Sequence, residues 1–182
     1  SAATAHRCHY HGEYALKVYI GYEAREQAAV DVAVKTLREV SGIEAELLVA
    51  DRLRDAGMLS RISDHRGGQA YDLVSNAPKA TAFAVSRFLT PLLCQGGWAL
   101  FTDCDMVFLR DPREMLAEIE PGKAVYVVKH EYTPTGQWKM DSQVQTQYPR
   151  KNWSSVALYD TEHKANRRLS LHEINTRPVR EL

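Results

Sequence analysis

Two carboxylates on alternate residues are the feature of this sequence most able to do chemistry. Asp103 and Asp105 flank Cys104 directly after the apolar run 98–101. Carboxylates this close repel and raise each other's pKa unless a cation lies between them. A hard cation that prefers oxygen, such as Mn²⁺ or Mg²⁺, would relieve that repulsion and would in turn bind a diphosphate. The pair therefore predicts a divalent metal site with Asp103 and Asp105 as ligands.

Spacing alone leaves a second interpretation open. An Asp-x-Asp pair arises by chance in roughly every second chain of this size, because charged residues make up about a quarter of ordinary sequence. In that case Asp103 caps a turn and Asp105 is solvated. The position after an apolar strand favours a site, since open α/β sheets bind ligands at the carboxyl ends of their strands.

The segments before the pair have the pattern of a parallel sheet unit. Residues 16–20 and 46–50 are short and rich in strand formers, and residues 25–40 between them predict a helix that stops at Ser41-Gly42. A strand, a crossover helix and a second strand are the repeating unit of such sheets. The apolar positions at helical spacing are Ala29, Ala33, Leu37 and Val40.

The remaining segments complete an α/β domain. The pattern weakens over residues 51–78, where residues 64–68 and 75–78 predict loop or turn. Residues 79–95 predict a second helix that Pro91 kinks or shortens. The pattern after residue 95 predicts strands at 98–101, 124–128 and 156–159, a capped helix start at 111–114, a long polar loop at 131–151 and short helical stretches after 162. We expect a single domain over 1–182 with a mixed, mainly parallel central sheet.

Composition limits the partners and the compartment. The 182 residues contain 23 Lys and Arg against 23 Asp and Glu, so no basic excess favours nucleic acid or an anionic membrane. No stretch has the length of a transmembrane helix. The three cysteines are odd in number and unpatterned, which favours a reducing compartment, so we expect a cytoplasmic protein.

Several segments in order resemble a known enzyme family. Residues 82–88 followed by 97–109 resemble the core of GT-A-fold glycosyltransferases, particularly family 8 and its bacterial relatives. Residues 18–26 look like the first strand and uridine-contacting loop of those relatives, and residues 127–132 and 148–155 look like their donor-sugar and acceptor segments. The resemblance covers nearly the whole chain. It implies a GT-A fold and a metal-dependent, hexosyltransferase-like enzyme that retains configuration, taking a UDP-sugar as donor and Mn²⁺ or Mg²⁺ as cofactor.

The resemblance also assigns roles to individual residues. Asp103 and Asp105 match the metal ligands, and Asp103 also matches a ribose contact. Arg87 matches a helix arginine that contacts the donor or the carboxylate pair. The other positions implied are Gly21, Tyr22, Arg25 and Trp153 for the donor and Asn152 for the sugar. Asp141 is a candidate for the catalytic step because it is a carboxylate within the long loop 131–151. For Tyr22 and Trp153, a plain core position is the open alternative.

Two departures from the family pattern stand out. The relatives complete their metal site with a histidine near the C-terminus, and nothing after His172 resembles that segment. His130 and His163 are candidate substitutes, or the chain is truncated at its C-terminus. Glu23 stands where the bacterial relatives carry aspartate.

Two other functions compete with glycosyl transfer. A sugar-phosphate nucleotidyltransferase would carry a glycine-rich phosphate loop after the first strand, and residues 21–25 hold one glycine, which disfavours it. A non-catalytic nucleotide-sugar-binding domain stays open because the third metal ligand is missing. If the chain is an enzyme, residues 131–151 are expected to be a mobile lid that donor and Mn²⁺ order.

Overall fold

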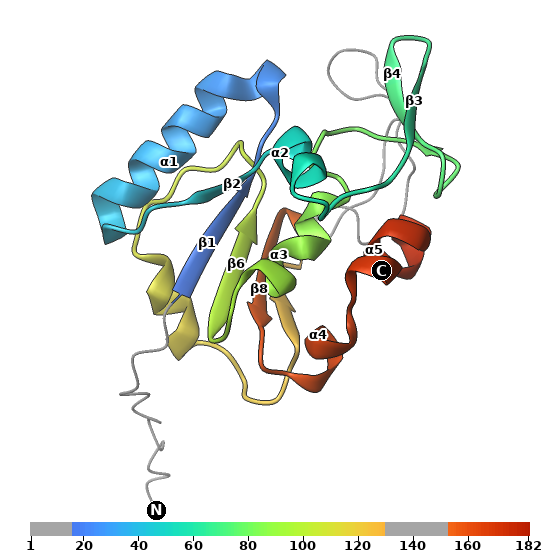
Figure 1. The fold of residues 1–182 in the computed structure, drawn as a ribbon. Helices are drawn as coiled ribbons and strands as arrows, with labels where there is room; N and C mark the ends of the chain where they lie inside the picture. Colours follow the sequence, from blue (N-terminus) through green and yellow to red (C-terminus); the bar gives the residue numbers. More distant parts are fainter. Residues whose placement is uncertain (1–15, 130–152) are drawn as a thin grey trace, which may run out of the picture.

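The computed structural model describes residues 16–129 and 153–182, which build a five-stranded mixed sheet in the order β2-β1-β6-β8-β7 (Figure 1). The strands are β1 (Leu16–Gly21), β2 (Glu46–Leu48), β6 (Trp98–Thr102), β7 (Val125–Val127) and β8 (Val156–Asp160). The prediction of an α/β fold with a mixed sheet is confirmed.

The prediction that this sheet is mainly parallel is wrong. Strand β1 pairs in parallel with β2 and β6, whereas β8 pairs antiparallel with both β6 and β7. The sheet therefore divides into a parallel half, β2-β1-β6, and an antiparallel half, β6-β8-β7.

Helix α1 (Gln27–Ser41) supplies the crossover between β1 and β2, as predicted, after a short 3₁₀ turn η1 (Ala24–Glu26). The helix buries Val30, Ala33 and Leu37 against the sheet. It ends at Gly42, whose φ of 70° is the left-handed conformation that glycine adopts without a steric penalty.

The single helix predicted for residues 79–95 is wrong. A turn leads instead into a 3₁₀ helix η2 (Ser86–Leu89) and a short helix α3 (Thr90–Leu93). Pro91 lies in the first turn of α3, where its missing N–H costs nothing, but within one continuous helix it would break the hydrogen-bond ladder. Phe83 and Cys94 of this segment are buried.

Residues 51–78, where the sequence pattern weakens, contain most of helix α2 (Ala50–Asp55) and a second sheet. That sheet consists of β3 (Ser63–Arg66), β4 (Gln69–Asp72) and β5 (Ala77–Pro78), all antiparallel. The predicted turns are confirmed at residues 67–68 and 75–76, whereas residues 64–66 and 77–78 are strand and not loop. Figure 1 shows the β3–β4 hairpin projecting from the body of the molecule. Most of its residues are polar or exposed, so the sequence has no apolar alternation to reveal it.

The strand predicted at 124–128 is confirmed as β7, which is an edge strand of the sheet, and Val125 is 38% exposed. Residues 106–109 form no strand, and Leu109 is 82% exposed. The capped start at Asp111 is confirmed, since its carboxylate accepts from the Arg113 backbone N–H at 2.9 Å, although the segment that follows is the 3₁₀ helix η3 (Pro112–Ala117).

The C-terminal part forms the short helices that the sequence predicts, α4 (Lys164–Arg168), α5 (Leu171–Thr176) and a 3₁₀ turn η6 (Val179–Glu181). Another 3₁₀ turn, η5 (Trp153–Ser155), precedes β8. Within residues 16–129 and 153–182, no helix combines the length and hydropathy that crossing a membrane requires.

Candidate functional site

Three strand ends meet at one edge of the five-stranded sheet. Strands β1 and β6 are parallel, with Ile20 opposite Thr102, so the chain leaves both strands at this edge. Strand β8 runs the other way and begins there, with Val156 opposite Thr102. The Asp103 backbone N–H donates to the Ser155 carbonyl at 2.9 Å, which fixes the carboxylate pair beside η5.

Arg87 anchors Asp103. The Arg87 Nη2 atom lies 3.3 Å from Asp103 Oδ1, and the two side chains are 12% and 21% exposed. The Arg87 Nη1 atom donates to the Ser154 carbonyl at 2.9 Å and to the Ser154 hydroxyl at 2.8 Å. Its guanidinium carbon lies 5.0 Å from the ring centre of Phe101, which holds the cation over an aromatic face. Arg87 and Asp103, which the resemblance pairs, are therefore brought together.

Asp105 is presented to solvent because Cys104 is turned inward. The Cys104 thiol is buried and donates to Glu26 Oε2 at 2.9 Å. Burial, with the hydrogen bond to the Glu26 carboxylate, raises the pKa of this thiol far above its ordinary value, so it stays protonated. Asp105 is exposed at the same edge. The residue between the two carboxylates thus acts as an anchor for the turn.

Asp103 and Asp105 both offer carboxylate oxygens, which are the ligand atoms that hard cations prefer. Within the described ranges, 16–129 and 153–182, no group of three or more His, Cys, Asp or Glu side chains is arranged to hold a metal ion. The described residues therefore fit a site in which two carboxylates grip the ion while diphosphate and water oxygens complete its shell, as is common for Mg²⁺.

The proposal that His163 takes the place of the missing third metal ligand is wrong. His163 caps α4, where its Nδ1 accepts from the Ala165 backbone N–H at 3.1 Å. It follows the end of β8, and Asp160 at that end pairs with Trp98 at the start of β6. His163 therefore lies at the edge of the sheet opposite Asp103. The other candidate, His130, lies outside the described residues.

Glu23 is a structural residue at this edge of the sheet. In the sequence it stands out only because the bacterial enzymes that the chain resembles carry aspartate at this position. It is 6% exposed, and its two oxygens accept from Arg25 Nε at 3.1 Å and from the Ala82 backbone N–H at 2.9 Å. It joins the end of β1 to the turn that leads to Arg87. Burial acts to raise the pKa of Glu23, but the hydrogen bonds from Arg25 and Ala82 outweigh it and hold the pKa below its ordinary value.

Replacing Glu23 with glutamine is expected to destabilise the protein by about 1–2 kcal/mol at neutral pH, because a charge-assisted bond is lost. A carboxyl whose pKa is depressed on folding stabilises the protein above its unfolded pKa, about 4.3 for glutamate, and stops doing so as pH falls through the folded value. Urea unfolding of both proteins should therefore show a gap at pH 7 that closes in acid. A gap that does not change with pH would contradict the assignment.

Close packing at position 21 leaves room only for glycine. A Cβ atom there would lie 2.5 Å from the ring of Phe83, closer than any real contact. The contact with a nucleotide that the resemblance implies stays a prediction. Tyr22 is half-buried against the core, and its hydroxyl donates to Gln27 Oε1 at 2.8 Å. This geometry leaves both interpretations of Tyr22 open.

The other predicted site residues fall into two groups. Arg25 is half-exposed beside Glu23, and Trp153 opens η5 at the same edge as Asp103, with Lys129 Nζ 5.8 Å from its ring centre. Both therefore lie at the same edge of the sheet as Asp103, and their roles stay predictions. Asp141, Asn152 and the loop 131–151 lie outside the described residues.

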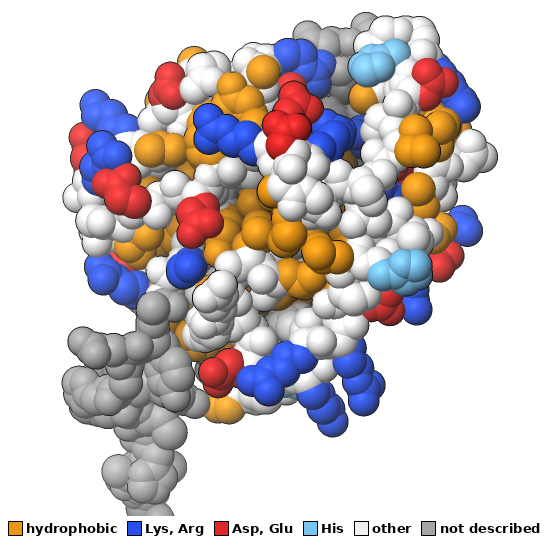
Figure 2. Space-filling view, viewed as in Figure 1, with side chains coloured by type: hydrophobic (Ala, Val, Ile, Leu, Met, Phe, Trp, Pro, Cys, Tyr) orange, Lys and Arg blue, Asp and Glu red, His pale blue; other side chains and the backbone are white. Residues whose placement is uncertain are grey.

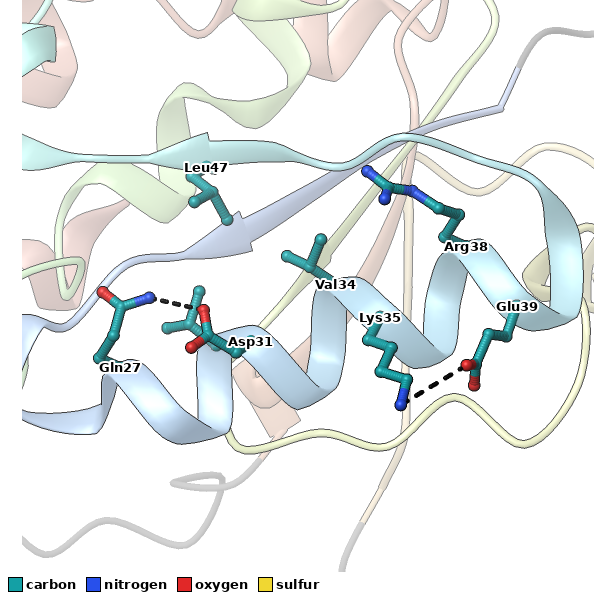
Figure 3. A pocket seen from close by; sticks show the side chains of 8 residues that line it. Gln27, Asp31, Val34, Lys35, Arg38, Glu39 and Leu47 are labelled. Carbon is teal, nitrogen blue, oxygen red and sulfur yellow. Dashed lines mark hydrogen bonds and ion pairs between the residues drawn. The ribbon is translucent and has the colours of Figure 1, made fainter.

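A hollow of about 480 Å³ lies over α1 and β2, and it contains none of the predicted site residues (Figure 3). Its polar side chains are engaged with one another or with neighbours. Gln27 donates to Asp31 at 2.7 Å, and Lys35 lies 3.8 Å from Glu39. Arg38, at its border, forms two hydrogen bonds with Glu44. Because these polar side chains already have partners, they are less available to bind a ligand than the carboxylates at the Asp103 edge.

No family model matches this chain. The chain is similar to Protein CDI of Arabidopsis thaliana, with 39% identity over 163 residues. The aligned region covers 88% of this chain and 58% of the relative, so the chain spans less than two thirds of the relative's length. The relative's name describes no reaction, and the function must be argued from the site.

Proposed function

We propose that this chain is the nucleotide-sugar-binding part of a metal-dependent glycosyltransferase with a GT-A fold. The observation that carries the proposal is the carboxylate pair at the end of β6, with Asp103 held by Arg87 and Asp105 exposed. Strand ends of open α/β sheets are where such folds bind ligands. The parallel β1-α1-β2 unit and the β1–β6 pairing give this edge the layout of a nucleotide-binding sheet.

Asp103 and Asp105 would hold Mn²⁺ or Mg²⁺, which neutralises charge on the leaving diphosphate when it is bound. Arg87 orients Asp103 and adds positive charge beside it. Its Nε is buried and has no hydrogen-bond acceptor within residues 16–129 and 153–182. Residues 21–25, at and after the end of β1, are proposed to line the binding site for the nucleoside.

The proposed reaction breaks the bond between the sugar's anomeric carbon and the diphosphate oxygen and forms a bond from that carbon to an acceptor hydroxyl. The resemblance to retaining enzymes favours acceptance of the acceptor's proton by the departing phosphate oxygen. That course requires no general base from the chain. What the chain supplies is charge at the phosphates and a fixed orientation of the donor.

Replacing Arg87 with alanine is expected to weaken UDP-sugar binding or turnover at least tenfold. A charge-assisted hydrogen bond is worth about 1.5–3 kcal/mol, and the loss of Arg87 also removes the anchor of Asp103. Lysine should restore activity only in part, because it lacks the planar fork that bonds Asp103 and Ser154 together. Steady-state kinetics with Mn²⁺ would measure both variants. Wild-type kinetics in Arg87→Ala would remove Arg87 from the site.

The proposed activity is tested by release of UDP from UDP-sugars in the presence of Mn²⁺, with EDTA as the negative control. Slow hydrolysis of at least one UDP-sugar that requires both Mn²⁺ and Asp105 would support a glycosyltransferase. Binding of UDP-sugar with no turnover in any acceptor mixture would favour the non-catalytic binding domain. Formation of a nucleotide-sugar and pyrophosphate from a nucleoside triphosphate and a sugar phosphate would identify a nucleotidyltransferase instead.

A further inference from the structure

A group of exposed cations lies at the sheet edge opposite Asp103. Helix α4 carries Lys164, Arg167 and Arg168, spaced three and four residues from the first, so the three side chains share one side of the helix. All three are exposed. Figure 2 shows Lys and Arg side chains gathered at the lower edge of the view, where Figure 1 places α4.

Lys123 belongs to the same group. The Asn166 side chain, buried under α4, donates to the carbonyl of Ala124 at 2.7 Å and to that of Asp160 at 2.7 Å. These bonds hold the turn before β7 against α4, and the exposed Lys123 directly precedes Ala124. We call Lys123, Lys164, Arg167 and Arg168 the α4 patch.

The α4 patch is a group of cations without ion-pair partners in the described part of the chain. Most Lys and Arg side chains in residues 16–129 and 153–182 form an ion pair. None of the four patch residues does so within those ranges, although the exposed Glu162 lies close to them in the chain. A chain with zero net charge therefore concentrates unpaired positive charge at one place, where an acidic partner would compensate it.

We infer that the α4 patch docks the protein onto the surface of an anionic phospholipid membrane. Exposed Val125 beside the patch adds an apolar contact of the kind that a lipid interface accepts. Nucleic acid fits less well, because proteins that bind its backbone commonly neutralise six to ten phosphates, whereas anionic lipids diffuse laterally and can gather under four cations. The zero net charge of the whole chain gives no sign of such a local patch.

This docking would leave the proposed donor site free. Asp160 at the α4 end of β8 pairs with Trp98, whereas Asp103 follows the other end of β6, so patch and site lie at opposite edges of one sheet. Membrane binding should therefore need neither UDP nor Mn²⁺, and Asp105→Asn should not change it. The inference stands independently of the proposed enzymatic function.

The test is flotation of the full chain with phosphatidylcholine vesicles that contain or lack phosphatidylserine. Binding should require phosphatidylserine and weaken steeply with added salt. Each cation near an anionic surface contributes about fivefold in partitioning, so Lys164→Gln/Arg167→Gln/Arg168→Gln should bind about a hundredfold more weakly. The three side chains are exposed, and circular dichroism should show an unchanged fold.

A matched control removes the same charge elsewhere. Lys35, Arg110 and Arg180 are exposed cations that already form ion pairs, and their triple replacement by glutamine should lower binding far less. Equal loss in the two triple variants would mean that net charge, and not the patch, drives binding. The inference would be overturned if the wild type did not float with these vesicles at low salt. That outcome includes the case in which the protein binds only RNA or an acidic protein.

Discussion

Replacing Asp105 with asparagine is expected to abolish the stabilisation that UDP and Mn²⁺ together give the wild-type protein. A ligand that binds only the folded state raises the melting temperature, so a thermal-shift titration detects its loss. Asparagine keeps the size of the side chain but removes the charge that a divalent ion requires. Because Asp105 is exposed, its replacement should leave the unliganded melting temperature unchanged.

Asp103→Asn makes the matched comparison. It should also abolish the UDP and Mn²⁺ effect, but it removes one partner of the Arg87 ion pair in a part-buried setting and should lower the unliganded melting temperature as well. A variant at Asp31, an exposed carboxylate on α1, serves as the control that keeps binding. Undiminished stabilisation by UDP and Mn²⁺ in both dyad variants would contradict the metal site.

Replacing Asp72 with asparagine is expected to destabilise the protein by about 3–5 kcal/mol, the range for breaking a buried ion pair. Asp72 and Arg61 are 3% and 2% exposed, and their side chains form two hydrogen bonds at 2.5 and 3.1 Å. Arg61 also donates to the carbonyls of Ile174 and Arg177. The pair thus holds the β3–β4–β5 sheet against α5, and asparagine would leave the buried guanidinium without its counter-charge.

Urea unfolding measures this change, and two further variants define its cause. The double variant Arg61→Met/Asp72→Leu removes both charges and should be less destabilised than Asp72→Asn, since no charge is left buried alone. Arg54→Gln breaks an exposed pair with Asp51 and should cost less than about 1 kcal/mol. A change below 1 kcal/mol in Asp72→Asn would mean that the network adds no stability.

Sequence patterns succeeded where apolar periodicity was strong. Helix α1 and strands β1, β6 and β8 follow from their buried faces, and Gly42 and Asp111 follow from the chemistry of helix ends. The same patterns failed in the polar hairpin β3–β4, beside which Arg61 donates hydrogen bonds to the carbonyls of Ile174 and Arg177 near α5. Local sequence patterns do not report hydrogen bonds between segments this far apart in the chain.

The candidate site shows the same division. The position of Asp103 and Asp105 after a buried strand was predictable, because strand ends are fixed by local pattern. The contacts of Arg87 with Ser154 and of Glu23 with Ala82 join residues more than fifty positions apart, and spacing cannot reveal them. Of the helix predicted at 79–95, which the sequence expects Pro91 to kink or shorten, only η2 and α3 form, and Pro91 lies in the first turn of α3.

The most direct test of the central claim is calorimetric titration of UDP into the wild-type protein, once with Mn²⁺ and once with EDTA. The proposed site predicts saturable binding with Mn²⁺ and a loss of that binding when EDTA removes the metal. Binding of equal affinity in EDTA, or no binding under either condition, would contradict a metal-dependent nucleotide site at Asp103 and Asp105.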